Sequence, residues 1–153
     1  MIRPADFPDI GPLTEMAFEF FSVGNLEGTG LACDQVSVMQ FLFNLIDSKN
    51  DILLVAEHEG ELIGVIGGAI TPWMFNENQL IMTEQVWFVP ERFREKHPMA
   101  ALRLLKELRK VGRKAGVETL ILSSNERPES AKVRSFYEKI GFSMKDVNYI
   151  GRI

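Results

Sequence analysis

The sequence is poor in the residues that build disulfides and metal centres. Its 153 residues include one cysteine, Cys33, and two histidines, His58 and His97, which are isolated from each other along the chain. A single cysteine cannot form an internal disulfide, and no Cys, His or carboxylate cluster has the spacing of metal ligands. We therefore expect no metal, and the cysteine usage agrees with a reducing, cytoplasmic environment.

Long apolar runs are absent as well. The composition is 46% apolar and 25% charged, and no apolar stretch reaches the roughly 20 residues that span a membrane. The N-terminal residues are interrupted by acidic side chains, unlike a signal peptide. Repeats and linker-like segments are missing too, so we expect one soluble domain over residues 1–153, without membrane contact and with enough apolar residues to bury a core.

Positive charge is nearly missing from the first half of the chain. Residues 1–80 contain two basic and 12 acidic residues, a net charge of −10, whereas residues 81–153 contain 15 basic and nine acidic residues, a net charge of +6. The overall net charge of −4 argues against nucleic acid as a partner. This polarity suits a protein that brings an anionic and a cationic ligand together; uneven solvation is the alternative interpretation.

Hydrophobic spacing predicts alternating strands and helices. The expected strands lie at residues 2–3, 52–56, 62–70, 80–89, 117–122 and 142–150. Helices with apolar stripes are expected around residues 13–21, 38–46, 99–115 and 130–140. Glycines within the third strand, such as Gly67 and Gly68, indicate close packing or one wall of a site, and packing is the favoured reading. The order β-α-α-β-β-β-α-β-α-β is typical of an α/β fold with sheet crossovers.

Two segments resemble the GNAT superfamily of N-acetyltransferases. Residues 86–105, which run from VWFVPERFR to AALRLL, look like that family's strand, phosphate loop and helix, and residues 136–142, FYEKIGF, match its F/L-Y-E-K-x-G-F pattern. The resemblance implies a mixed α/β (α+β) fold. Its central sheet would be mostly antiparallel, with six or seven strands, about four flanking helices and a splay between the fourth and fifth strands. The chain also looks like the short members that occur in bacteriophage genomes.

The loop before the long helix is expected to bind the phosphates of acetyl-CoA. A helix N-terminus offers unpaired N–H groups and the positive end of its dipole, which together bind a pyrophosphate. The family's sequence pattern for this loop is R/Q-x-x-G-x-G/A. Here His97 and Met99 replace the small residues, and Pro98 lies between them. Either these side chains crowd the phosphates, or the loop bulges outward and presents Ala100 and Ala101. The implied cofactor contacts are Arg94, Glu95, Lys96, His97, Met99 and Ala100.

Acyl transfer needs few side chains, because the thioester is already activated and positioning supplies most of the rate. The resemblance implies that Tyr137 donates a proton to the leaving thiolate and that Glu84 takes a proton from the attacking amine, directly or through water. From spacing alone, packing is the favoured role of Tyr137, and the resemblance reverses that order; Glu84 is equally a solvated carboxylate. Cys33 is distant in sequence from both motif segments, which gives no support to a covalent cysteine intermediate.

Further contacts with CoA follow from the same resemblance. The pantetheine arm is expected to pair with the backbone of Phe88 and Val89, beside the gap in the sheet. Asn125 and Ser130 are expected to bond the pantetheine amides, although helix capping is the simplest role for Ser130.

The acceptor amine is the least defined part of this hypothesis. Trp73 and Phe75, together with the acidic first half, are candidates for an aromatic mouth that binds a cationic small-molecule or protein amine. The same exposed aromatic loop is equally a contact in a homodimer. The leading hypothesis is transfer of acetyl from acetyl-CoA to a primary amine by direct attack in a ternary complex. The alternative is a catalytically weak or inactive module of the same fold that binds CoA or a partner.

Overall fold

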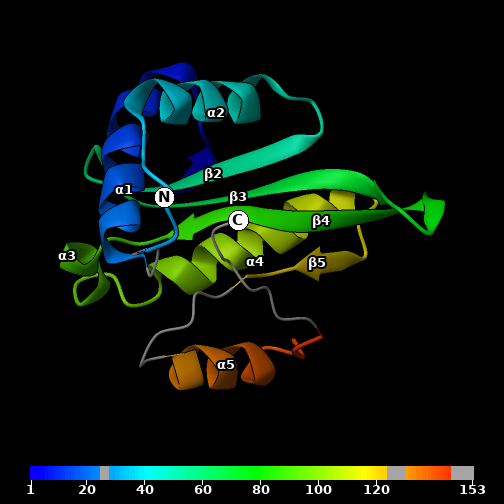
Figure 1. Cartoon of the computed structure of the whole chain (residues 1–153). Coiled ribbons are helices and arrows are strands. Elements are labelled where there is room, and N and C mark those ends of the chain that lie inside the picture. Colours follow the sequence, from blue (N-terminus) through cyan, green and yellow to red (C-terminus); the bar gives the residue numbers. More distant parts are fainter. Residues whose placement is uncertain (25–27, 124–129, 146–153) are drawn as a thin grey trace.

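A single mixed sheet organises the part of the chain that the computed structural model describes, residues 1–24, 28–123 and 130–145 (Figure 1). The strands are β1 (Ile2–Pro4), β2 (Asp51–His58), β3 (Glu61–Trp73), β4 (Asn76–Phe88) and β5 (Thr119–Ile121). The helices are the 3₁₀ turn η1 (Phe7–Asp9), α1 (Ile10–Val23), α2 (Gln35–Asp47), α3 (Glu91–Arg94), α4 (Ala100–Lys114) and α5 (Ser130–Lys139). None of these described helices is both long and apolar enough to cross a membrane.

The sheet has the order β1-β2-β3-β4-β5, in which the first four strands are antiparallel neighbours and β5 runs parallel to β4. The expected mixed α/β fold is therefore confirmed. The expected strand number of six or seven is wrong for the described residues, which form five strands. Residues 142–145 are not in a strand, and the rest of the predicted last strand, residues 146–150, lies outside the described residues.

Helices cover both faces of the sheet, and strand alternation assigns side chains to them. Leu53 and Val55 of β2 pack toward α1 and α2, whereas Leu54 and Ala56 pack toward α4. Figure 1 shows the sheet between these two layers, with α5 on the α4 side. The three fully buried leucines of α4, Leu104, Leu105 and Leu108, complete this layer. Sequence periodicity of 2 in the strands and 3.6 in the helices accounts for these layers.

The glycines of β3 are sites of close packing, as expected. A Cβ atom on Gly67 would lie 2.9 Å from Leu53 Cδ1, and one on Gly68 would lie 2.7 Å from Met82 Cγ. Side chains of the neighbouring strands thus occupy the space that larger residues would need.

The pairing of β4 changes along its length. A β-bulge interrupts its ladder with β3, because Gly67 pairs with Val86 and Gly68 pairs with Glu84, which leaves Gln85 as an extra residue. On its other side, β4 pairs with β5 only over Ile81–Thr83. Five residues of β4, from Glu84 to Phe88, therefore continue past the last residue that β5 pairs within the described chain.

Candidate active site

Glu84 and Tyr137 both bond the backbone of one residue, Ser123, although they are far apart in sequence. Oε2 of Glu84 accepts the backbone N–H of Ser123 at 2.9 Å. The hydroxyl of Tyr137 donates to the backbone carbonyl of Ser123, also at 2.9 Å. Strand β4 supplies the first side chain, helix α5 the second, and the segment just after β5 supplies the shared residue. The structure thus brings the two expected catalytic residues together.

The bulge explains why a side chain bonds the amide of Ser123. Ser123 lies two residues beyond Ile121, the last residue of β5 that pairs with β4. Because the extra residue Gln85 shifts the β4 backbone at this level, the ladder with β5 stops. The carboxylate of Glu84 then satisfies the N–H group, which would otherwise be left without a strand partner.

The surroundings of the pair alter both pKa values. Burial raises the pKa of Glu84, and the hydrogen bond from Ser123 opposes this change. Burial, with a further contribution from the negative charge of Glu84, raises the pKa of Tyr137 to about 12. At neutral pH the tyrosine is therefore protonated and able to donate, while Glu84 is a stronger proton acceptor than an exposed glutamate.

Aromatic rings hold Tyr137 in place. Its ring stacks on Trp87 at a centroid distance of 6.0 Å and an interplanar angle of 16°. Phe142, from the motif that carries Tyr137, lies 6.2 Å from the tyrosine ring and also contacts the Arg109 guanidinium of α4 at 5.6 Å. The indole Nε1 of Trp87 is buried and finds no hydrogen-bond partner among the described residues. Such an unsatisfied donor costs roughly 1–3 kcal/mol.

The loop between β4 and α4 folds back on itself. Nε of Arg94 donates to the carbonyl of Val89 at 2.8 Å, and its guanidinium lies 5.9 Å from the ring centroid of Phe88. This arginine therefore already bonds the strand end at which pantetheine was expected. Glu95 and Lys96, which follow it, are exposed.

His97 lies against the other histidine of the chain, although the two are isolated from each other in the sequence. Its ring contacts that of His58, at the end of β2, with a centroid distance of 4.5 Å. The neighbouring Met99 is 46% exposed. Contact with His58 directs the His97 side chain toward the β2–β3 turn.

Unpaired amides remain at the start of α4. The Ala100 N–H, an expected phosphate contact, is taken by the carbonyl of His97 at 2.9 Å, and Arg103 N–H bonds the carbonyl of Met99 at 2.9 Å. Within the described chain, the intervening amides of Ala101 and Leu102 take part in no backbone hydrogen bond. These two N–H groups, one of them on Ala101, which the outward-bulging loop was expected to present with Ala100, are available to an anion.

Two expected pantetheine contacts, Asn125 and Ser130, stay predictions. Ser130 is the first residue of α5, and its side chain is not among those that the structure describes. Asn125 lies outside the described residues altogether.

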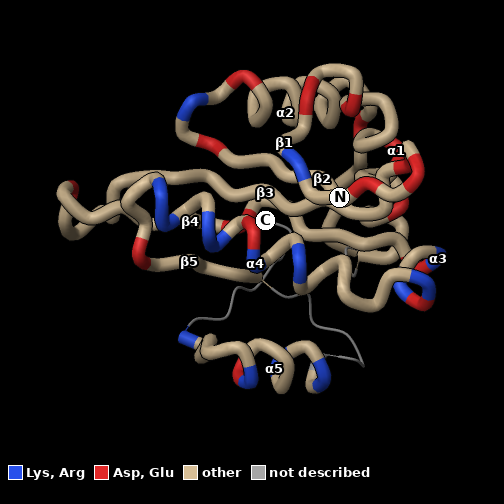
Figure 2. Tube along the Cα trace, turned by 180° about the vertical axis from the view of Figure 1, so that it is seen from behind, with Lys and Arg blue, Asp and Glu red and all other residues tan. Residues whose placement is uncertain are grey.

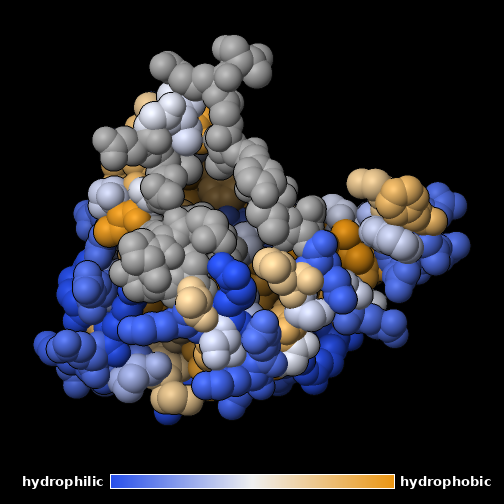
Figure 3. Space-filling view, turned by 60° about the horizontal axis from the view of Figure 1, so that its bottom comes forward, coloured by the Kyte–Doolittle hydropathy of each residue, from blue (hydrophilic) through white to orange (hydrophobic). Residues whose placement is uncertain are grey.

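Trp73 and Phe75 are not brought to the Glu84–Tyr137 pair. They lie at the tip of the β3–β4 hairpin, 41% and 78% exposed, with their rings 5.3 Å apart. Figure 3 shows the apolar side chains of this tip at one projecting end of the molecule. Glu84 is eight residues along β4 from Asn76 at the tip, a separation of roughly 26 Å at about 3.3 Å per residue.

The predicted charge asymmetry is visible on the folded chain. Figure 2 marks acidic residues around α1 and α2 and basic residues along α4. One of the two basic residues in the first half, Arg3, is engaged structurally, since it bonds Asp9 at 2.7 and 2.9 Å and Glu57 at 2.8 Å. The α1–α2 side consequently presents mainly negative charge.

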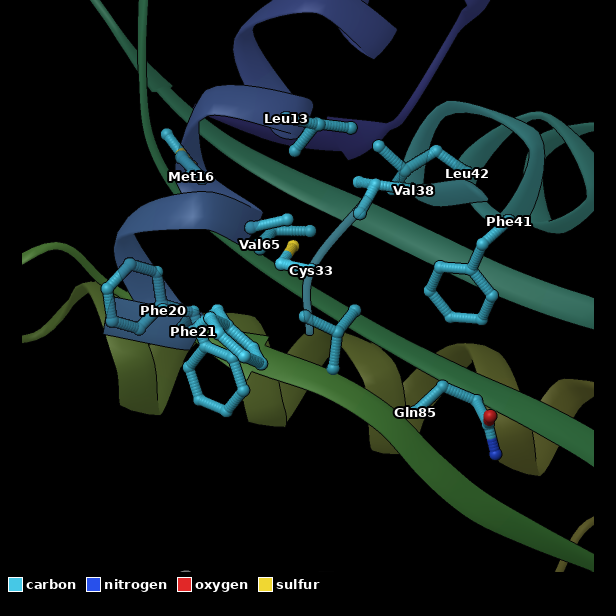
Figure 4. Close-up of a pocket in the computed structure, with 13 residues that line it drawn as sticks. Leu13, Met16, Phe20, Phe21, Cys33, Val38, Phe41, Leu42, Val65 and Gln85 are labelled. Atoms are coloured by element: carbon cyan, nitrogen blue, oxygen red, sulfur yellow. The ribbon is translucent and has the colours of Figure 1, made fainter. Parts of the chain in front are cut away.

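Sequence reasoning missed a cavity on that side of the sheet. It has a volume of about 230 Å³ and lies between α1, α2 and the strands β3 and β4 (Figure 4). Most of its lining residues belong to the apolar stripes of the two helices, and a stripe gives the same pattern whether it packs fully or lines a cavity. The three phenylalanines Phe20, Phe21 and Phe41 were the available signal.

Comparison with known proteins identifies the family. The sequence matches the acetyltransferase (GNAT) family over residues 24–142, and the chain belongs to this family. A search of curated proteins gives no match.

Solved structures share the fold at low sequence identity. A transcriptional regulator from Bacillus halodurans C-125 has a TM-score of 0.77 at 18% identity, with 100% of this chain and 99% of that chain covered. Ribosomal-protein-alanine N-acetyltransferase from Brucella melitensis biovar Abortus 2308 has a TM-score of 0.72 at 16% identity, with coverage of 100% and 99%. A predicted acetyltransferase with acetyl-CoA from Clostridium acetobutylicum has a TM-score of 0.72 at 16% identity, with coverage of 95% and 91%.

Proposed function

We propose that the protein transfers an acetyl group from acetyl-CoA to a primary amine by direct attack in a ternary complex. The observation that carries this proposal is the position of Glu84 and Tyr137. They bond the backbone N–H and C=O of the same residue, Ser123, beside the point at which pairing between β4 and β5 stops. Membership of the GNAT family supports the donor and the reaction type.

The two side chains have complementary tasks in this reaction. Glu84 accepts a proton from the amine nitrogen as the new C–N bond forms with the acetyl carbon. Tyr137 donates its hydroxyl proton to the sulfur of CoA as the C–S bond breaks. The raised pKa of each group suits its task, since Tyr137 stays protonated and the Glu84 carboxylate holds an accepted proton more firmly.

Acetyl-CoA supplies an activated thioester, and the chain's residues would hold it at two places. The amides of Ala101 and Leu102 are free to bond phosphate oxygens at the positive end of α4. The backbone of Phe88 and Val89, past the last residue paired with β5, would bond the pantetheine arm. The carbonyl of Val89 already accepts Arg94, so its amide is the more accessible partner.

Thermal unfolding and mass spectrometry test this proposal together. Acetyl-CoA at 100 times its Kd should stabilise the fold by about 2.7 kcal/mol, whereas pantetheine, which lacks the nucleotide phosphates, should have a much smaller effect at the same concentration. Incubation with a panel of primary amines should yield acetylated products. Stabilisation without any product would favour the CoA-binding or partner-binding module. Absence of stabilisation would contradict both functions.

A further inference from the structure

The indole of Trp87 carries a polar group that the fold leaves without a partner. Its Nε1 is buried and finds no hydrogen-bond acceptor among the described residues, and no other side-chain nitrogen or oxygen of these residues is in the same position. An indole nitrogen is only a donor, and buried donors almost always have an acceptor. This N–H group therefore calls for a specific explanation.

The neighbours of the indole bury it and offer its N–H no acceptor. Ring centroids of Phe136 and Tyr137 lie 6.4 and 6.0 Å from that of Trp87. The indole also packs against the apolar core on the α4 side of the sheet. The hydroxyl of Tyr137, the nearest polar group on these rings, is directed to the carbonyl of Ser123.

The position of Trp87 in β4 places this donor in the candidate active site. Pairing of β4 with β5 ends at Thr83 within the described chain, and Trp87 lies in the stretch of β4 beyond that point. Its ring stacks on Tyr137, the proposed proton donor to the sulfur of CoA. Tyr137 in turn shares Ser123 with Glu84. The unsatisfied N–H is thus joined by direct contacts to both groups proposed for catalysis.

The surroundings of the indole restrict which acceptor it takes. A phosphate brought among aromatic rings would lose its hydration at a high cost, whereas an amide or thioester carbonyl carries no net charge. The acylated pantetheine arm of acetyl-CoA contains carbonyls of both kinds. In the proposed function this arm runs along the end of β4, with its sulfur near Tyr137.

We propose that Nε1–H of Trp87 donates a hydrogen bond to a carbonyl oxygen of the acylated pantetheine arm. This inference rests on the proposed acetyl transfer and adds one side chain to the backbone contacts with the donor. The N–H is unsatisfied in the ligand-free protein and satisfied in the complex, so removal of this penalty contributes to the affinity for acetyl-CoA.

Deletion of the N–H group alone tests the proposal. In the Trp73→Phe variant the only tryptophan is Trp87, so β-(3-benzothienyl)alanine, in which sulfur replaces the N–H, can be incorporated at this position with the ring shape nearly retained. Calorimetry should show a Kd for acetyl-CoA that is about 5–150-fold higher than in Trp73→Phe protein with ordinary tryptophan, because a buried carbonyl loses its donor. The Kd for adenosine 3′,5′-bisphosphate, which lacks the pantetheine arm, should stay unchanged.

Comparison of CoA with acetyl-CoA identifies the carbonyl. A higher Kd for both ligands would support a bond to a pantetheine amide, and a higher Kd for acetyl-CoA alone would support a bond to the thioester, which CoA lacks. An unchanged Kd for acetyl-CoA would overturn the proposal. An equal rise in the Kd for adenosine 3′,5′-bisphosphate would also overturn it, since the analogue would then disturb the whole binding site.

The indole proton gives a second readout without any change at position 87. In Trp73→Phe protein labelled with ¹⁵N, the single indole N–H signal should move downfield when CoA or acetyl-CoA binds and should not do so with adenosine 3′,5′-bisphosphate. A signal that stays in place while acetyl-CoA binds and amines are acetylated would overturn this inference alone. Absence of acetyl-CoA binding by the wild type would refute the proposed function, and this inference with it.

Discussion

Replacing Tyr137 with phenylalanine removes a single oxygen atom. The substitution keeps the ring that stacks on Trp87 and deletes the hydroxyl that bonds the Ser123 carbonyl. If the hydroxyl is the proton donor to the leaving thiolate, the variant loses the general acid while the aromatic packing remains.

The structural and catalytic contributions of this hydroxyl differ in size. One neutral hydrogen bond contributes about 0.5–1.5 kcal/mol to stability, and in a protein of this length each kcal/mol shifts Tm by about 2–4 °C. A purely structural role therefore predicts a Tm lower by roughly 1–6 °C with a folded and active enzyme. Loss of a general acid predicts a fall in kcat of about 10²–10⁴-fold, which corresponds to about 2.7–5.4 kcal/mol.

Rates of thiol release from acetyl-CoA at saturating amine measure kcat, and calorimetry measures the Kd of acetyl-CoA. We expect kcat of Tyr137→Phe to fall at least about 100-fold while the Kd changes by less than about threefold. Because the pKa of Tyr137 is about 12, the wild type should show no loss of kcat from this group between pH 7 and 10. A variant with nearly unchanged kcat and only the lower Tm would refute the donor role and leave Tyr137 as a packing residue.

Two further predictions concern the same region. Burial raises the pKa of Glu84. The contribution of this carboxyl group to stability is therefore fully present below the ordinary glutamate pKa and is lost as the pH rises through the raised folded pKa. Glu84→Gln should gain stability relative to the wild type between pH 4 and pH 8, and a difference in Tm that is constant over this range would contradict the raised pKa. Trp73→Phe leaves Trp87 as the only tryptophan of the chain, and its fluorescence emission should change when acetyl-CoA binds beside Tyr137. The reciprocal variant Trp87→Phe should show no change in emission, and a response from this variant alone would place the ligand elsewhere.

The sequence predicted the two side chains of the candidate site but not what joins them. The FYEKIGF motif indicated Tyr137, and the strand that ends near Val89 indicated Glu84. Ser123 lies in neither of the two motif segments. Its role depends on the bulge at Gln85, and a bulge arises from the packing of two strands rather than from local propensity.

Other differences have a similar origin in long-range contacts. His58 and His97 are 39 residues apart in the sequence, and their rings meet only because the β2–β3 turn lies beside the loop before α4. The pattern near the C-terminus predicted a strand, yet residues 142–145 form none. Phe142 instead packs against Tyr137 and Arg109. An apolar run fits a strand and a packed loop equally well.

Glu84 and Tyr137 anchor Ser123 from both sides of its Cα atom, one through the N–H and the other through the C=O. These two groups belong to successive peptide planes, and the two bonds together fix how both planes are turned about that atom. A ligand that moved Ser123 away from β4 would loosen the carboxylate and the phenol in the same movement. Proton acceptor and proton donor would then become available together, with no need for a separate signal to each.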